Sequence, residues 1–138
     1  MMRVLSLDVG DRTIGIAASD ALGLTAQGVE TIRRKSLQQD LGRLAELMQT
    51  YETKKLIVGL PKNMDGTQGE RCEIVREFAG KVQQAIPETE IVFWDERLST
   101  VAASRSLIEA DVSRRKRKKV IDKMAAVFIL QGWLDSQS

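Results

Sequence analysis

The hydrophobic pattern changes its period once along the chain, and this change constrains the fold more than any other feature. Up to residue 32, apolar residues form short runs or alternate with small residues, as in β-strands, over residues 3–9, 14–18 and 26–32. Between Leu37 and Met48 they recur every three or four residues, as on one face of a helix. A three-stranded meander is therefore predicted to precede the helical segments.

Two further apolar runs predict parallel strands after the meander. Residues 55–59 and 91–94 are short apolar runs, typical of strands that are buried on both faces. Between them, residues 74–86 have helical spacing, which Pro87 ends. Strands that alternate with helices in this way form parallel pairs. The expected fold class is α/β: a five-stranded mixed sheet, with a three-stranded antiparallel meander plus two parallel strands, flanked by helices.

The last third of the chain is predicted to be mostly helical. Ser99 or Thr100 can cap a helix that ends near residue 110, and a strongly apolar helix is expected over roughly residues 120–135. No long linker rich in proline or glycine interrupts the chain, and no internal repeat is visible. Residues 1–138 are therefore expected to form a single domain.

The composition excludes several kinds of catalytic site. The chain has no histidine, which rules out Ser-His-Asp and Cys-His nucleophiles and histidine-bound zinc or iron. Its single cysteine, Cys72, cannot form an internal disulfide, so a reducing compartment fits. The longest charge-free apolar stretch near the C-terminus, residues 124–134, is too short to span a bilayer. We expect a cytoplasmic protein without a membrane partner.

Four carboxylates stand where the predicted elements can bring them together. Asp8 ends the first strand, Asp95 and Glu96 follow the fifth, and Asp122 lies in the first turns of the apolar last helix. Ligands of open α/β sheets bind at the carboxyl ends of the strands. Neighbouring residues of a strand point to opposite faces, so one of Asp95 and Glu96 is expected to face Asp8. Glu96 is favoured for its longer reach, and Asp95 remains the alternative.

A structural explanation exists for each acid taken alone. Asp8 could hydrogen-bond the following turn, Asp95 or Glu96 could sit favourably at a helix start, and Asp122 could pair with Lys118. Taken together, three converging carboxylates would repel one another unless a cation lay between them. Mg²⁺ and Mn²⁺ prefer oxygen ligands, and two such ions can support phosphodiester cleavage without histidine. The predicted catalytic and metal-binding residues are thus Asp8, Glu96 (or Asp95) and Asp122.

The positive charge of the chain is concentrated in one segment. Six consecutive cations occupy positions 114–119, Arg114, Arg115, Lys116, Arg117, Lys118 and Lys119. Without them the formal net charge falls from +2 to −4, with 15 basic against 19 acidic residues. This basic run could be a merely solvated loop, but its place just before Asp122 favours contact with nucleic-acid phosphates. We expect residues 113–119 to be an exposed loop.

Other polar residues near the same edge could contact a phosphate backbone. Arg12 follows the first strand, Lys62 and Asn63 follow the fourth, and Arg97 follows the fifth. Neither GxxxxGK[ST] nor GxGxxG after a strand occurs, so the usual nucleotide-binding fingerprints are absent.

Four segments together resemble the YqgF (RuvX) family. They are Asp8-Val9-Gly10 with Arg12, Gly15 and Ala17; VGLPKNMDG at 58–66; DERLST at 95–100; and KVIDKMAA at 119–126. The resemblance covers essentially the whole chain and implies an RNase H-like fold. It also implies a bacterial cytoplasmic nuclease that matures the 5′ end of pre-16S rRNA during ribosome biogenesis, with Asp8, Glu96 (or Asp95) and Asp122 as its metal-binding acids.

Three alternatives remain open beside this hypothesis. A Holliday junction resolvase would act on branched DNA as a dimer. Such resolvases usually carry a fourth acid three residues after an acid on the last helix, and the position three residues after Asp122 is Ala125. A non-catalytic RNA-binding factor for ribosome assembly would use the basic run, with the acid cluster as a vestige. An ATPase of the actin and sugar-kinase type needs a second lobe that 138 residues cannot supply. The expected partners are structured RNA, such as pre-rRNA or a pre-ribosomal particle, or branched DNA, bound by a monomer or weak dimer.

Overall fold

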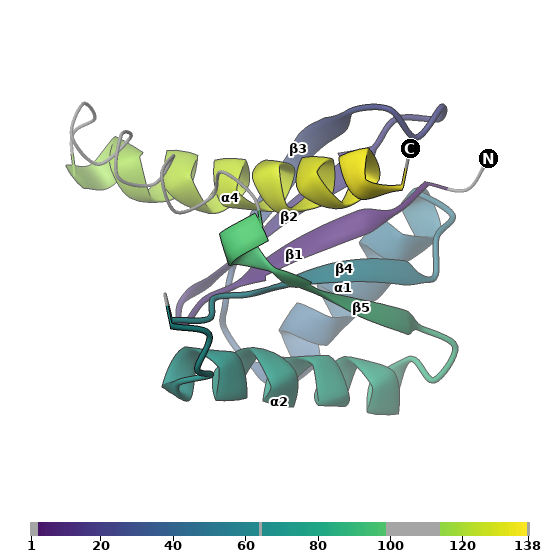
Figure 1. The fold of residues 1–138 in the computed structure, drawn as a ribbon. Coiled ribbons are helices and arrows are strands. Elements are labelled where there is room, and N and C mark those ends of the chain that lie inside the picture. The colour runs from purple at the N-terminus through teal and green to yellow at the C-terminus, as the bar shows by residue number, and fades with distance from the viewer. Residues whose placement is uncertain (1–2, 64, 99–113, 138) are drawn as a thin grey trace.

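A computed structural model of the chain describes the backbone of residues 3–63, 65–98 and 114–137, and the side chains of the same residues except 114–123 (Figure 1). The elements, in chain order, are β1 (Leu5–Val9), β2 (Thr13–Ser19), β3 (Ala26–Arg33), α1 (Leu37–Thr50), β4 (Lys55–Leu60), α2 (Glu70–Ala85), β5 (Glu90–Asp95), the 3₁₀ turn η1 (Glu96–Leu98) and α4 (Arg114–Ser136).

The five strands form one mixed sheet in the order β3-β2-β1-β4-β5. β1, β2 and β3 pair antiparallel, whereas β4 pairs in parallel with both β1 and β5. The α/β class and the predicted division into a meander and two parallel strands are confirmed. Because β1, β4 and β5 run in the same direction, their C-terminal ends lie along one edge of the sheet, here called the carboxyl edge.

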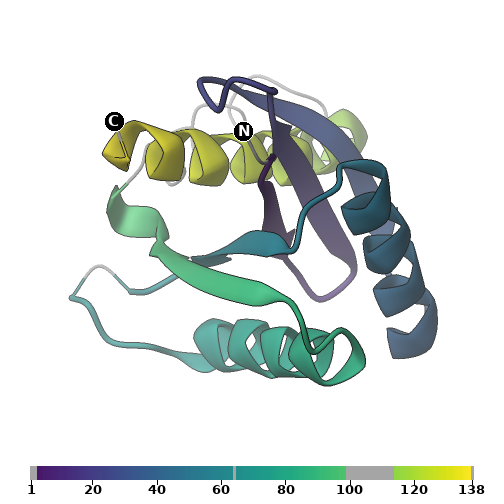
Figure 2. The same ribbon diagram turned by 90° about the vertical axis from the view of Figure 1, so that its right-hand side faces the viewer.

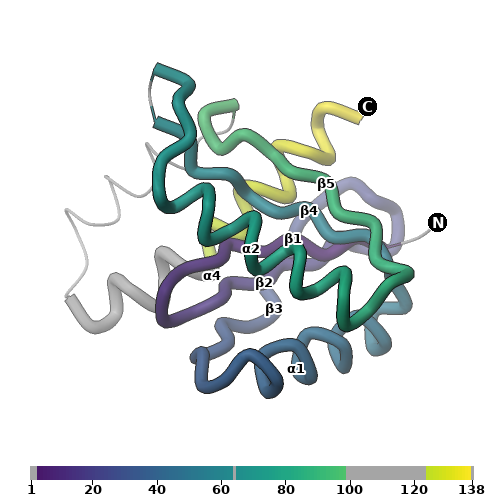
Figure 3. Tube along the Cα trace, turned by 90° about the horizontal axis from the view of Figure 1, so that it is seen from below, coloured from purple at the N-terminus to yellow at the C-terminus, as the bar shows by residue number. Residues whose placement is uncertain are grey.

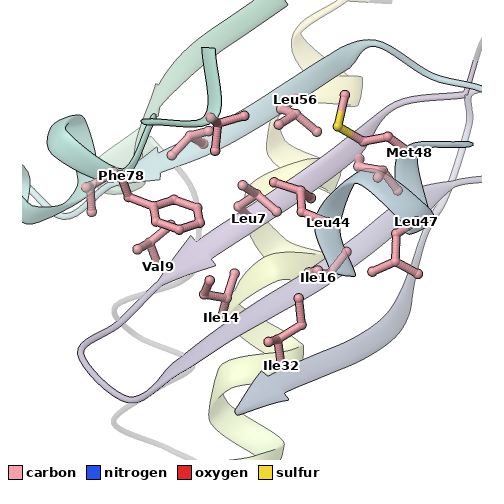
Figure 4. Close-up of a cluster of buried hydrophobic side chains, with 14 of the residues drawn as sticks. Leu7, Val9, Ile14, Ile16, Ile32, Leu44, Leu47, Met48, Leu56 and Phe78 are labelled. Carbon is pink, nitrogen blue, oxygen red and sulfur yellow. The ribbon is translucent and has the colours of Figure 1, made fainter. Parts of the chain in front are cut away.

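Helices cover both faces of the sheet. Figures 1 and 2 show α1 and α2 on one face and α4 alone on the other. Between the sheet and the first pair of helices lies the larger apolar cluster, in which Leu7, Leu56 and Phe78 are buried (Figure 4). Such burial of large side chains contributes about 1.5–3 kcal/mol each and dominates the stability of a domain this size.

Helix α4 packs closely on the sheet because its contact face carries small residues. Ala125 and Ala126 are buried there together with Ile129 and Leu130. The hydroxyl of Ser6 in β1 donates a 2.7 Å hydrogen bond to the carbonyl of Ala126. This close approach fixes the helix over the middle of β1.

The direction of α4 follows from a second contact. Gln131 lies over the start of β3, where its amide oxygen accepts a 3.0 Å hydrogen bond from the backbone of Ala26. The start of β3 is at the opposite end of the sheet from the carboxyl edge, since Ala26 pairs with Ser19. Helix α4 therefore begins on the carboxyl-edge side and runs antiparallel to β1, as Figure 1 shows.

The N-terminal part of α4 corrects one prediction. The helix begins at Arg114, so the basic run is helical and not a loop before a helix that starts near residue 120. Arginine and lysine are good helix formers, and the apolar, packed second half of the helix lets those turns propagate from an existing nucleus. The predicted helix after Ser99 or Thr100 lies outside the described residues. Within the described part, no helix is both long and apolar enough to cross a bilayer.

Candidate active site

Asp8 lies on the α4 face of the sheet, one residue before the end of β1. Its neighbours Leu7 and Val9 belong to the cluster under α1 and α2, so the alternation of the strand turns Asp8 to the opposite face. The side chain is only 8% exposed. Asp8 pairs with Gly15 of the neighbouring strand β2, and Gly15 has no side chain to fill the space beside the carboxylate.

Glu96 approaches the same face from the far side of β4. It begins η1, immediately after β5, and is 5% exposed. A Cβ atom added to Gly59 of β4 would lie 3.3 Å from Cγ of Glu96 and would collide with the side chain of Ile129 in α4. Glu96 is therefore held between β4 and α4, on the side of the sheet that Asp8 faces.

Gly59 makes this arrangement possible. It follows Val58, which pairs with Leu7 of β1, and it is itself paired with Trp94 of β5. Gly59 thus stands on the middle strand of three, with Asp8 on one side and the end of β5 on the other. Glycine here leaves room for both Ile129 and Glu96, whereas any larger residue would displace one of them.

Asp95 has a different environment from Glu96. The guanidinium of Arg97 contacts both of its carboxylate oxygens, with Nη2 2.7 Å from Oδ2 and Nε 3.1 Å from each oxygen. The backbone N–H of Arg97 donates to the same carboxylate at 3.0 Å. The hydrogen bond from the Arg97 side chain, more than any other interaction, holds the pKa of Asp95 below its usual value. Asp95 therefore closes the turn that begins η1.

The loop between β4 and α2 packs against the same arginine. Gly66 has φ +88°, a left-handed conformation that favours glycine, and a Cβ there would lie 3.3 Å from Nη1 of Arg97. Asn63 donates from its side-chain amide to Thr67 at 2.9 Å, and Thr67 donates in turn to Asp65. Asn63 and Arg97, predicted as nucleic-acid contacts, thus also organise this loop.

The remaining candidates lie around these two carboxylates. Lys62 is half-buried where the chain leaves β4, and Arg12 is exposed in the β1–β2 turn. Asp122 and the basic run are on α4, within the part whose side chains are outside the description. Among the described residues, no three acids or cysteines gather closely enough to hold a metal. Asp8 and Glu96 are among these described residues, whereas the side chain of Asp122 is not described.

Sequence reasoning missed the role of Gly59. It was visible only as the last residue of an apolar run, although a glycine inside a buried strand often marks a close approach of another element. The alternation rule predicted that Asp95 and Glu96 would differ in direction, and the two acids have different neighbours, Arg97 for Asp95 and the Gly59 position for Glu96. It could not show that Arg97 would hold Asp95, because that contact forms only where the strand gives way to a 3₁₀ turn.

The chain is similar to known proteins over nearly its whole length. The model of the RuvX family, described as "Holliday junction resolvase", matches residues 2–136. A protein of Desulforamulus reducens named "Putative pre-16S rRNA nuclease" is 58% identical over 98% of this chain and 98% of its own length. A protein of Clostridium tetani with the same name is 55% identical, over 98% of this chain and 97% of its own.

Solved structures of low sequence identity share the fold. RuvC of T. thermophilus, in complex with a Holliday junction substrate, has a TM-score of 0.63 at 13% identity, over 100% of this chain and 98% of that one. The fowlpox virus resolvase, solved with Holliday junction DNA, has a TM-score of 0.55 at 13% identity, over 99% of both chains. At this identity the likeness shows the fold alone, and it confirms the RNase H-like architecture.

Proposed function

We propose that this chain, which belongs to the RuvX family, is a nuclease that hydrolyses phosphodiester bonds in the 5′-end maturation of pre-16S rRNA. One observation carries the chemistry: two buried carboxylates, Asp8 and Glu96, lie on the same face of the sheet beside its carboxyl edge, under α4. The substrate class follows from the name of relatives that are 55–58% identical over almost the full length.

The donor set fits hard divalent cations. Burying a carboxylate is costly unless a positive charge or hydrogen-bond donors compensate it, and two on one face raise that cost. Strands two apart in a sheet are separated by roughly 10 Å, which an aspartate and a longer glutamate can bridge through cations. We propose that Asp8 and Glu96 hold Mg²⁺ or Mn²⁺, which supply an activated water and stabilise the leaving oxygen.

Asp122 completes the proposed set by its spacing along α4. It precedes Ala126 by four residues, which is about 6 Å or one helical turn, on the same side of the helix. Asp8 follows Ser6 by two residues, which is about 6.6 Å along the strand. Ser6 contacts Ala126, and α4 runs antiparallel to β1. Asp122 on the helix and Asp8 on the strand are therefore displaced from this contact by similar distances in the same direction, toward the carboxyl edge.

Each residue then has a separate task. Asp8, Glu96 and Asp122 would hold the cations beside the scissile phosphate. Lys62, Arg12 and the basic run bind neighbouring phosphates of the substrate, without reading its sequence. Asp95 keeps η1 closed through Arg97, so that Glu96 is presented to the site. We place this activity in the cytoplasm, where the single, buried Cys72 stays reduced.

The test is cleavage of a 16S precursor fragment and of a four-way DNA junction, each with Mg²⁺, with Mn²⁺ and with a chelator. Wild type and Asp8→Asn are compared, with binding to both probes measured in parallel. We expect metal-dependent cutting of the RNA that falls at least about a thousandfold in the variant, as for the loss of a catalytic group, with binding retained.

Three results would contradict the proposal. Equal cleavage by Asp8→Asn would exclude the carboxylate site, and binding without any cleavage by wild type would favour an assembly factor that does not cut RNA. Cutting of the junction alone would favour the family's description as a resolvase. Against that alternative, the position three residues after Asp122 is Ala125, which is 2% exposed and packed on the sheet.

A further inference from the structure

We propose that Arg12, Arg33 and Lys35, here called the basic ridge, form a phosphate-binding surface on the β3 side of the site. Of the site residues predicted from the sequence, only Arg12 belongs to it. The sequence pattern does not reveal the ridge, because the three cations are up to 23 positions apart. The ridge would hold the nucleic-acid backbone beyond the reacting phosphate. In this role it rests on the proposed function for the identity of the substrate.

Strand pairing brings the three cations to one place. Arg33 ends β3 and pairs with Thr13, the residue that follows Arg12. The backbone N–H of Arg34 donates a 2.8 Å hydrogen bond to the carbonyl of Arg12, which joins the β1–β2 turn to the segment between β3 and α1. Figure 3 shows these two segments side by side. All three ridge side chains are exposed.

The backbone beneath the ridge is fixed by Arg34. Its Nη1 donates to the carbonyl of Gly10 at 2.9 Å, and its Nε lies 3.3 Å from Oδ2 of Asp40, which is 3% exposed. The guanidinium also stacks over Phe78, 5.1 Å from the ring centre. The other oxygen of Asp40 accepts from the N–H of Lys35 at 3.2 Å. A surface ordered in this way before binding loses little entropy on binding.

The ridge keeps its positive charge within the described part of the chain. None of the three ridge cations forms an ion pair with a described acid. Asp11 is the one acid beside Arg12 in the β1–β2 turn. Two other exposed cations are neutralised by contrast: Arg43 pairs with Glu30 at 2.6 Å, and Lys54 pairs with Glu88 at 2.5 Å. Three uncompensated cations on a fixed backbone attract a polyanion.

The position of the ridge defines a path for the substrate. The sheet order places β2 and β3 on one side of Asp8, and β4 and β5 on the other. Lys62, at the end of β4, and the ridge therefore flank Asp8 along the carboxyl edge. A backbone that crosses this edge would contact Lys62, the cation site and the ridge in turn, so that the ridge would set the register of cleavage.

The experiment compares two triple variants with the same change in net charge. The ridge variant is Arg12→Gln, Arg33→Gln and Lys35→Gln; the control is Arg3→Gln, Lys54→Gln and Lys81→Gln, three exposed cations away from the carboxyl edge. Binding of a 16S precursor fragment is measured without divalent cations, over a range of salt concentrations. We expect the ridge variant to raise Kd about tenfold and to flatten the slope of log K against log salt by about 2, with the control near wild type.

The outcomes separate this inference from the proposed function. Equal weakening by both triples, unchanged binding by the ridge variant, or no RNA binding by wild type would overturn the ridge. Weakened binding by the ridge variant alone, in a protein that never cleaves, would retain the ridge and reject the nuclease. Thermal unfolding of both variants checks the fold, and Arg34 is left intact to preserve it. In a cleaving protein, a higher KM with unchanged kcat is expected.

Discussion

At the scale of single residues, Asp95 and Glu96 show how neighbouring acids acquire different tasks. Phe93 and Trp94 already alternate between the two apolar clusters, and the 3₁₀ turn then separates the two carboxylates. Asp95 is occupied by Arg97, with its side chain 15% exposed, whereas Glu96 is buried towards α4. Because Asp95 already pairs with a guanidinium, and Glu96 lies on the face of the sheet that Asp8 shares, we propose Glu96 as the metal ligand of the two.

We predict opposite consequences for the two isosteric substitutions. Glu96→Gln should abolish metal-dependent cleavage, while Asp95→Asn should retain measurable cleavage and cost about 1 kcal/mol of stability at pH 7, typical of a partly exposed ion pair. The folded-state pKa of Asp95 is lowered, so its stabilising effect is present above the ordinary aspartate pKa and is lost as the pH falls through the lowered value. The stability difference between wild type and Asp95→Asn should therefore shrink below about pH 4.

Urea unfolding from pH 7 down to pH 3, together with cleavage assays, checks both halves of this prediction. If Asp95→Asn were inactive and Glu96→Gln active, the assignment of the two acids would be reversed. A stability difference that stays constant down to pH 3 would show that the contact with Arg97 contributes nothing as an ion pair.

Much of the site was predictable at this scale, and the remainder has a physical reason. The sequence pattern placed Asp8 at the end of the first strand but did not assign it a face. Strand alternation would have done so, because it turns Asp8 away from the face on which Leu7 and Val9 are buried. The environment of Asp95 was not predictable, since it depends on the geometry of a 3₁₀ turn. The role of Gly59 depends on Ile129, 70 positions away, which no local pattern can reveal.

At the scale of elements, the contact between β4 and α4 controls the position of Glu96. We predict that Gly59→Ala costs about 1–3 kcal/mol, as overpacking of a well-filled core does, and lowers cleavage at the same time. The added methyl group meets Ile129 first and Glu96 next. Gly80→Ala in α2 is the matched control, because a Cβ there has nothing within 4 Å and should be neutral or slightly stabilising.

A second substitution makes this prediction specific. Ile129→Val removes the Cδ1 atom that the new methyl group would strike, so Gly59→Ala with Ile129→Val should recover part of the lost stability and cleavage. A double-mutant cycle from urea unfolding measures the coupling, which we expect to favour the double variant by about 0.5–3 kcal/mol. Additive effects of the two substitutions would show that the contact between the strand and the helix is not what limits position 59.

The predicted elements differ from the observed ones mainly at α4. The periods of two and of three to four residues located the five strands, α1 and α2, because each buries one face or stripe against the same sheet. The predicted start of α4, near residue 120, was wrong, since the basic run was placed outside the helix. Their high helix propensity and the anchored half at Ala126 and Ile129 outweigh that repulsion.

At the scale of the whole molecule, two basic features lie toward the same end of the sheet. The ridge stands at the ends of β1 and β3, and α4 begins with the six-residue basic run on the carboxyl-edge side. The rest of the chain is net acidic, at −4 without the run. Such a separation of charge orients a polyanion before contact, and it repels nucleic acid from the remaining surface.

We predict that the basic run supplies most of the affinity for nucleic acid and none of its sequence preference. Glutamine at all six positions from Arg114 to Lys119 retains a helix-forming side chain at each position while the formal charge changes from +2 to −4. Binding of RNA hairpins of unrelated sequence should weaken by a similar factor for each. The slope of log K against log salt should flatten by up to about 4 to 5, the release expected for six phosphate contacts at about 0.7 per phosphate on a single strand and about 0.9 on a duplex. The substitutions leave unchanged the second half of α4, residues 125–136, so circular dichroism should show that the helix is retained.

An unchanged salt slope would assign the basic run to the solvated surface and leave the ridge as the principal phosphate contact. Loss of binding to one hairpin but not to the others would mean that these cations read base sequence, contrary to contacts made with the backbone alone.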